Sequence, residues 1–246
     1  MLISIIGTGD AYALYRANSA ILVEEQQFKL LVDCGPTVCQ QLWKTANWQH
    51  INALYFTHLH PDHTLGLTSL INRFNSMGRR QPLQIFCHKG KEARLQQLVE
   101  FGFWSDRENY PVEFVIIDDE DLSQPFQIGP FSCLSEQTHH GVTNHSLWLD
   151  DGQKRLFYSG DGCITEQSAK LIANSDLAFI ECQAMSLAQG AGHSDFAKIL
   201  ELAKLIPDVP FQLYHIGDTD YSPMTDAVKD LQRISIAEQG TEIELK

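Results

Sequence analysis

Residues 57–66 read Thr-His-Leu-His-Pro-Asp-His-Thr-Leu-Gly, which places His58, His60, Asp62 and His63 within six positions. Three imidazoles and a carboxylate this close together cost roughly 1–3 kcal/mol each if they are buried without a partner. Pro61 disfavours helical backbone at His60, and side chains two apart on an extended chain point the same way. The spacing therefore predicts that His58 and His60 hold one metal ion while Asp62 and His63 hold a second. The alternative is a histidine-rich loop that binds nothing, but turn chemistry requires no such set.

The segment before this cluster, residues 51–57, is apolar enough to predict a buried strand. The cluster would then lie at a strand's end, where layered α/β proteins usually place their active sites. With 246 residues, 43% of them hydrophobic, the chain can bury a large core, and we expect one domain over residues 1–246. It has neither an apolar run of about 18 residues nor a secretory signal. We therefore expect a cytoplasmic protein that does not contact membranes.

Hydrophobic periodicity predicts a mixed α/β order of elements. Strands are expected near residues 2–7, 19–24, 28–33, 51–57, 83–87, 112–117, 130–136, 145–149, 154–159, 177–181 and 211–215. Helices are expected near residues 37–47, 65–76, 91–102, 165–173, 194–206 and 223–234.

The run His58-Leu59-His60-Pro61-Asp62-His63 resembles the His-X-His-X-Asp-His signature of the metallo-β-lactamase superfamily. Residues 5–11, 18–23 and 30–35 are similar to the first strands of its ribonuclease Z-like, phosphodiesterase branch, and the resemblance covers nearly the whole chain. It implies an α/β fold, the four-layer αββα sandwich, with a metal site along one edge. It is also compatible with a homodimer.

The later motifs resemble the remaining ligands of that branch. His140 precedes Gly-Val, Asp161 follows Ser-Gly, and His215 follows the apolar strand 211–214. His139 is the alternative to His140, since adjacent side chains of an extended segment point to opposite faces. Asp161 and His215 could instead be a turn aspartate and a core histidine. The resemblance implies a complete ligand set of His58, His60, Asp62, His63, His140, Asp161 and His215.

This donor set of imidazoles and carboxylates suits two divalent ions, Zn²⁺ first, with Mn²⁺ or Fe²⁺ as alternatives. Two ions about 3.5–4 Å apart can hold a bridging hydroxide and clamp an in-line displacement. Asp62 can also orient that hydroxide, so we expect it to be catalytic as well as a ligand. The chemistry indicated is hydrolysis.

His193 points to the type of hydrolysis. It lies in Gly190-Ala191-Gly192-His193-Ser194-Asp195, where Ser194 is a suitable N-cap for the next helix. It resembles the histidine that assists phosphodiester cleavage in the ribonuclease Z-like branch, although a loop histidine without a role is the alternative. The resemblance also implies that Asp33 and Glu181 support ligands from behind, with Glu181 paired to His193.

The substrate is less well defined. The net charge of −13 opposes a general nucleic-acid binder. It still allows a local basic patch, because Arg73, Arg79 and Arg80 lie just after the metal loop and Lys89, Lys91 and Arg94 lie in a predicted helix. The alternative is a solvated basic face that binds no ligand. The chain has Pro36-Thr37-Val38 where ribonuclease Z enzymes usually have Glu-Gly-Thr, and it contains no insertion resembling their RNA-gripping arm. We therefore predict a phosphodiesterase acting on a small or cyclic phosphodiester. The alternatives are a ribonuclease Z-type transfer-RNA 3′ endonuclease, a thioester, lactone or β-lactam hydrolase, and a noncatalytic metal-bound binding protein.

The cysteines and His145 are the last residues with more than one interpretation. Six scattered cysteines contain no Cys-X-X-Cys pair, which argues against a zinc ribbon or a disulfide framework. Cys163 falls two residues after Asp161 and either faces the site or simply packs. His145 matches no histidine of the family, so it either contacts substrate or is buried in the core.

Overall fold

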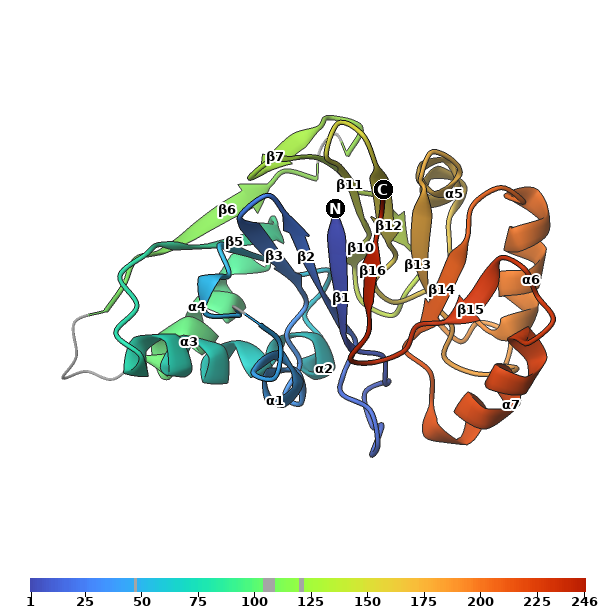
Figure 1. The fold of residues 1–246 in the computed structure, drawn as a ribbon, viewed down its shortest axis with the longest axis horizontal. Helices are drawn as coiled ribbons and strands as arrows, with labels where there is room; N and C mark the ends of the chain where they lie inside the picture. Colours follow the sequence, from blue (N-terminus) through green and yellow to red (C-terminus); the bar gives the residue numbers. More distant parts are fainter. Residues whose placement is uncertain (47, 104–108, 120–121) are drawn as a thin grey trace.

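The protein consists of two seven-stranded β-sheets with helices on both outer surfaces (Figure 1). The computed structural model describes residues 1–46, 48–103, 109–119 and 122–246. The first sheet has the order β16-β1-β2-β3-β4-β5-β6. Its strands are β1 (Leu2–Gly7), β2 (Ala20–Glu25), β3 (Phe28–Val32), β4 (Ala53–Tyr55), β5 (Leu83–His88), β6 (Val112–Ile117) and β16 (Glu242–Glu244). The pairs from β3 to β6 are parallel and the others antiparallel.

The second sheet has the order β15-β14-β13-β12-β11-β8-β7. Its strands are β7 (Phe126–Ile128), β8 (Phe131–Leu134), β11 (Leu147–Asp150), β12 (Arg155–Tyr158), β13 (Leu177–Glu181), β14 (Phe211–Tyr214) and β15 (Ile234–Ile236). The pairs from β12 to β15 are parallel, and β7, β8, β11 and β12 pair antiparallel. A two-stranded ladder of β9 (Gln137–Thr138) and β10 (Asn144–His145) lies apart from both sheets.

Alternating side chains of the strands create the four layers, because successive residues of a strand face opposite sides of its sheet. In β3, Leu30 and Val32 pack into the core between the sheets, whereas Leu31 packs into the core beneath the outer helices. In β12, Tyr158 faces the second sheet's inner side and Phe157 its outer side. Each sheet is therefore buried on both faces.

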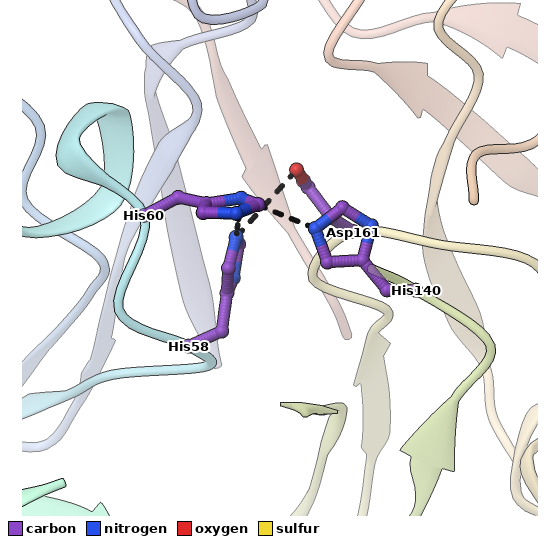
Figure 2. Close-up of side chains that lie close together, drawn as sticks. All are labelled: His58, His60, His140 and Asp161. Atoms are coloured by element: carbon purple, nitrogen blue, oxygen red, sulfur yellow. Dashed lines mark hydrogen bonds and ion pairs between the residues drawn. The ribbon is translucent and has the colours of Figure 1, made fainter. Parts of the chain in front are cut away.

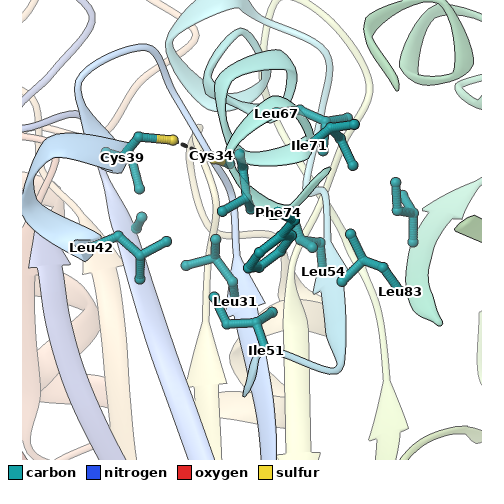
Figure 3. Packing of buried hydrophobic residues seen from close by; sticks show 14 of the residues in the cluster. Leu31, Cys34, Cys39, Leu42, Ile51, Leu54, Leu67, Ile71, Phe74 and Leu83 are labelled. Atoms are coloured by element: carbon teal, nitrogen blue, oxygen red, sulfur yellow. Dashed lines mark hydrogen bonds between the residues drawn. The ribbon is translucent and has the colours of Figure 1, made fainter. Parts of the chain in front are cut away.

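Helices cover the two outer faces. The first sheet carries α1 (Val38–Leu42), α3 (Gly66–Ser76) and α4 (Glu92–Gly102), and a short turn of helix, α2 (Pro61–Thr64), precedes α3. The second sheet carries α5 (Glu166–Ala173), α6 (Phe196–Leu205) and α7 (Asp218–Val228). Figure 3 shows how Leu31, Leu54 and Phe74 meet in the first of these outer cores, with Cys34 and Cys39 at its edge.

The sheet topology brings the functional loops together. Asp33 follows β3, Thr57 and His58 follow β4 by a few residues, and Asp161 and His215 follow β12 and β14. These strands belong to the parallel part of each sheet, so their carboxyl ends open at the same edge of the sandwich. The loops of both halves therefore contribute to one site.

The predicted fold, the αββα sandwich, is confirmed by this architecture and by the structural relatives described below. Several predicted boundaries are wrong. The helix predicted at 37–47 ends at Leu42, and residue 47 lies outside the described part of the chain. The helix predicted at 223–234 begins instead at Asp218, because Asp218 and Asp220 favour a helical first turn and Pro223 is accommodated inside the helix. Residues 234–236 form β15.

One further observation concerns membranes. Among the described residues, no helix has the length and apolar character needed to cross a bilayer.

Candidate metal centre

The motif at residues 58–63 is shaped by its proline. His60 has extended backbone, with φ −63° and ψ 149°, and Pro61 occupies the first turn of α2. Proline is favoured at this first helical position because the backbone nitrogen there has no hydrogen-bond partner within the helix. The chain therefore turns sharply between His60 and Asp62, which separates the motif into two pairs of side chains.

The first group of donors lies around His60 (Figure 2). Its Nδ1 is 3.1 Å from Nε2 of His58 and 3.2 Å from Nε2 of His140, while Oδ2 of Asp161 is 3.7 Å from Nε2 of His58. Ligand atoms of a tetrahedral ion at about 2.0–2.1 Å lie about 3.4 Å apart. The spacing of these four donors therefore fits one divalent ion.

The second group lies on the other side of Asp161. Nε2 of His63 is 3.2 Å from Oδ2 of Asp62 and 3.3 Å from Oδ1 of Asp161. Nε2 of His215 is 3.3 Å from Oδ2 of Asp62 and 3.4 Å from Oδ2 of Asp161. Asp161 thus belongs to both groups, as expected of a carboxylate shared between two ions.

Buried atoms without partners test whether this second group suits a metal. Nε2 of His63 and Oδ1 of Asp161 are buried and make no hydrogen bond. Leaving such atoms unpaired costs about 1–3 kcal/mol each. A cation bound between them would give both atoms a partner, so these residues are suited to hold a metal ion.

Electrostatics divides the two groups. Burial lowers the pKa of His58, His60 and His140, so these rings are neutral and their lone pairs are available. Burial also opposes a charge on His215, but Asp161 and Asp62 outweigh it and raise the pKa of His215 to about 9. Asp161 in turn has a pKa well below its usual range: burial opposes its ionisation, but His215 and His63 outweigh that effect. The second group is therefore the more strongly charged.

Residues behind the donors fix the orientation of the rings. Oδ2 of Asp33 accepts from Nδ1 of His63 at 2.8 Å, and the hydroxyl of Thr57 lies 3.0 Å from Nδ1 of His58. The carbonyl of Gly192 accepts from Nδ1 of His140 at 2.7 Å. In each case the second nitrogen, Nε2, is directed to the cluster, which is how second-shell partners usually select a ligand's tautomer.

His193 lies beside both groups. Its Nδ1 is 2.9 Å from Oε1 of Glu181, and its ring is stacked on that of His215 with centroids 5.7 Å apart. Glu181 is fully buried, and its Oε2 accepts the backbone N–H groups of Gly162 and Ser194. The His193 side chain is 21% exposed, so it can meet a ligand from solvent.

The structure bears on two questions that the sequence left open and on one prediction. His139 is exposed, and its backbone pairs with Cys163, while His140 joins the ligand group. Cys163 packs beneath the His193 loop, where its thiol donates to the carbonyl of His193 at 3.1 Å. The prediction that Ser194 caps the following helix is wrong: Asp195 is the N-cap and accepts from the N–H of Lys198.

The sequence reasoning did not identify Asn144. Its Oδ1 accepts the N–H of Asp161 at 3.1 Å, and its Nδ2 donates to the carbonyl of Ser159 at 2.9 Å. Asn144 therefore holds the backbone of the Asp161 loop from a strand 17 residues away. No spacing in the sequence indicated this contact.

Comparison with known proteins places the chain in a family. The family model described as "Anti-Pycsar protein Apyc1" matches residues 1–243. The chain belongs to the Apyc1 family. The Ribonuclease Z of Natronomonas pharaonis is 28% identical over 285 residues, covering 93% of this chain and 92% of that protein. The Ribonuclease Z of Metallosphaera sedula is 33% identical over 152 residues, and the chain spans only 49% of that relative.

Solved structures agree on the fold of this Apyc1-family chain. The metallo-β-lactamase fold protein YhfI from Bacillus subtilis superposes with a TM-score of 0.83 at 22% identity, over 98% of both chains. The short form of human tRNase Z superposes with a TM-score of 0.80 at 22% identity, over 100% of both chains. The predicted superfamily and its ribonuclease Z-like branch are therefore confirmed, as is a metal-dependent hydrolase at the level of that superfamily.

Proposed function

We propose that the protein is a dinuclear metal-dependent phosphodiesterase that cleaves a small or cyclic phosphodiester. The observation that carries this proposal is the His193–Glu181 pair beside the two donor groups. A histidine held in this position can stabilise a phosphoryl oxygen or protonate a leaving oxygen. Hydrolysis of a thioester, lactone or β-lactam would not need it.

In the proposed centre, each ion has three donors of its own and shares Asp161. The first ion is held by His58, His60 and His140, and the second by Asp62, His63 and His215. This set contains no thiolate, which suits Zn²⁺ first, with Mn²⁺ or Fe²⁺ as alternatives. When bound, such ions activate water and neutralise charge on the phosphoryl group.

The protein's own side chains then orient the reactants. Oδ2 of Asp62 faces His63 and His215, so we assign its Oδ1 to accept a hydrogen bond from the attacking water. His193 donates from Nε2 to the phosphoryl or leaving oxygen. Glu181 accepts from Nδ1 of His193, and this contact keeps the reactive nitrogen directed toward the substrate.

A groove beside His60 supports a small anionic substrate. Its volume is about 520 Å³, and its lining includes the cations Lys89 and Arg94. Lys91 and Asp119 also line the groove, but the ammonium group of Lys91 is bonded to Thr57 and His145. Lys89, Lys91 and Arg94 belong to the basic patch that the sequence suggested, whereas Arg73, Arg79 and Arg80 do not line this groove. The net charge of −13 of the whole chain opposes a long nucleic acid, and only α5 and β13 lie between Asp161 and His193. A substrate that fits the groove is therefore favoured.

Cleavage of transfer-RNA precursors is the second candidate, because several relatives carry the name Ribonuclease Z. The two activities differ in their dependence on salt. Binding of transfer RNA through many phosphates weakens steeply as salt rises, whereas a substrate with one phosphate responds weakly.

The experiment is hydrolysis of bis(p-nitrophenyl) phosphate by protein reconstituted with Zn²⁺ or Mn²⁺. We expect turnover that is abolished in Asp161→Ala and falls about 10²- to 10⁴-fold in His193→Ala. A thioester, a β-lactam and a transfer-RNA precursor are tested alongside. Two bound metals with no diester turnover would overturn the proposal, and turnover of the thioester or β-lactam would then identify the activity.

We also place the protein in the cytoplasm. All six cysteines are free in the structure, although Cys34 and Cys39 have sulfur atoms 4.0 Å apart. Free thiols are typical of a reducing compartment.

A further inference from the structure

A second buried cluster of titratable side chains lies behind the metal-binding loop. It consists of His88 at the end of β5, Lys91 at the start of α4, Asp119, and His145 of β10. The rings of His88 and His145 stack in parallel with centroids 3.6 Å apart. His88, Lys91 and His145 are buried, and the proposed reaction uses none of these four side chains for chemistry.

The hydrogen bonds assign the protons of this cluster. Lys91 can only donate, so its contact of 2.9 Å makes Nδ1 of His145 the acceptor. Nε2 of His145 then carries the hydrogen and faces Oδ2 of Asp119 at 3.5 Å. Oδ1 of Asp119 accepts from Nδ1 of His88 at 2.5 Å. Nε2 of His88 is then an acceptor, and the hydroxyls of Tyr55 and Ser135 each lie 3.0 Å from it.

This cluster differs from the metal centre, although His88, Asp119 and His145 also have ligand atoms close to one another. Each imidazole nitrogen already has a polar partner, and the ammonium group of Lys91 repels a second cation. In the metal centre, by contrast, Nε2 of His63 makes no hydrogen bond and faces only the carboxylates of Asp62 and Asp161, the other proposed donors. The second cluster is therefore a closed network whose cation is Lys91.

The hydrogen bonds of the network reach the metal-binding loop at Thr57. The carbonyl of Thr57 accepts from Nζ of Lys91 at 2.8 Å and from the backbone N–H of His145 at 3.0 Å. The hydroxyl of Thr57 donates to Asp33 and accepts from Nδ1 of His58. Asp33 in turn binds His63. Thr57 therefore links Lys91 to one proposed ligand of each ion.

We propose that Lys91, backed by Asp119, His88 and His145, is a positioning residue that sets the metal affinity of the centre by fixing Thr57. This inference rests on the metal centre of the proposed function but not on its substrate. A cation anchored behind the loop holds the Thr57 carbonyl, and the Thr57 hydroxyl then keeps His58 and Asp33 in their ligand-supporting orientations. Without the ammonium group of Lys91, the loop would have more conformational freedom. Metal binding would have to remove this freedom, and the affinity would fall.

Metal binding in the absence of substrate tests this role. Zn²⁺ affinity is measured by competition with a chromogenic chelator, and the ligand field by the visible spectrum of the Co²⁺-loaded protein. We expect Lys91→Met to bind about 10- to 100-fold more weakly, with an altered Co²⁺ spectrum. Lys29→Met is the matched control, because Lys29 is also buried and ion-paired, to Glu24, but lies at the other end of β3 from Asp33.

Chemical rescue separates positioning from general stability. In Lys91→Ala, methylammonium should restore Zn²⁺ affinity, and tetramethylammonium, which cannot donate a hydrogen bond, should not. Thermal unfolding of the metal-free variants shows whether each is folded. If Lys91→Met does not fold, Asp119→Asn replaces it, since this substitution removes the charge that balances Lys91 and should weaken affinity in the same direction.

The outcomes are distinct. Wild-type affinity and spectrum in a folded Lys91→Met or Asp119→Asn protein would overturn the inference, and so would equal losses in Lys29→Met. Weakened metal binding without diester turnover in the wild type would support this role of Lys91 while overturning the proposed phosphodiesterase. A wild-type protein that binds no divalent ion would overturn both.

Discussion

Asp161 is the residue on which both donor groups depend, because its Oδ2 lies near His58 of the first group and His215 of the second, and its Oδ1 lies near His63. Its small neighbours Gly160 and Gly162 both have positive φ, which lets the backbone turn closely around one carboxylate. The motif at residues 58–63 could be interpreted from the sequence, since its donors are adjacent. The Lys91 network could not be interpreted in this way. Only His88 and Lys91 are near each other in the sequence, and all other pairs among His88, Lys91, Asp119 and His145 are 26 or more residues apart.

Two adjacent histidines provide a direct test of the proposed ligand set. His140→Ala removes a donor of the first ion, and we expect diester turnover and metal affinity to fall at least about 100-fold. His139→Ala should leave both near wild-type values, since that side chain is exposed. Steady-state kinetics and chelator competition on both variants measure this. The reverse order of effects would make His139 the ligand.

The buried network also predicts how stability depends on pH. Burial, with help from His88 and Lys91 and against Asp119, lowers the pKa of His145 to about 2. The unfolded chain therefore binds a proton that the folded protein does not, and the unfolding free energy falls as pH decreases from about 6.5. Replacing His145 with Gln should make this slope shallower by up to about 1.4 kcal/mol per pH unit.

Urea unfolding of the metal-free protein between about pH 4 and 6.5 checks this expectation. The exposed His50 supplies the control variant, His50→Gln. An identical slope in His145→Gln and the wild type would show that His145 is protonated in the folded protein.

At the scale of elements, the strand-end loops were the most predictable part of the fold. Apolar runs such as 177–180 and 211–214 identified strands that end beside site residues: β13 ends at Glu181, and β14 ends directly before His215. Short elements were missed, because three-residue strands such as β7 and β16 are too short to show a recognisable alternation of apolar and polar residues. Pairing between β16 and β1 spans nearly the whole chain, and no local pattern encodes it.

The loop after β12 is expected to tolerate no side chain at Gly162. A Cβ there would lie 2.8 Å from the carbonyl oxygen of His139 and 2.9 Å from Cβ of His140, at a φ of +104°. We expect Gly162→Ala to destabilise the protein by about 1–3 kcal/mol more than Gly152→Ala. Gly152 has a φ of +90° but open space around it, so Gly152→Ala measures the backbone strain without the steric clash.

Chemical denaturation of the two variants measures this difference, and metal titration tests whether the displaced His140 weakens binding. Equal stabilities would mean that the loop relaxes without cost.

At the scale of the molecule, the metal centre joins the two halves of the sandwich. His58, His60, Asp62 and His63 come from the half with the first sheet, and His140, Asp161 and His215 from the half with the second. A ligand at 100 times its dissociation constant stabilises the folded state by about 2.7 kcal/mol. For a chain of this length, chelation should therefore lower the melting temperature by about 5–10 °C.

Differential scanning calorimetry with and without a chelator measures this shift. Asp161→Ala should start from the lower melting temperature and respond little to the chelator. If both proteins respond equally, the metal binds elsewhere.

A single domain over residues 1–246 stays a prediction.

The first sheet ends at β6, whose sequence Val-Glu-Phe-Val-Ile-Ile pairs with β5 along one side only in the described structure. The other side is a row of backbone donors and acceptors on a strand of high β-propensity. Such an edge strand can pair with strands of other molecules and cause aggregation. Glu113 is the one charge within this strand, and its exposed carboxylate acts as a gatekeeper. We therefore expect the solubility of the whole protein at high concentration to depend on Glu113, a residue far from its chemistry.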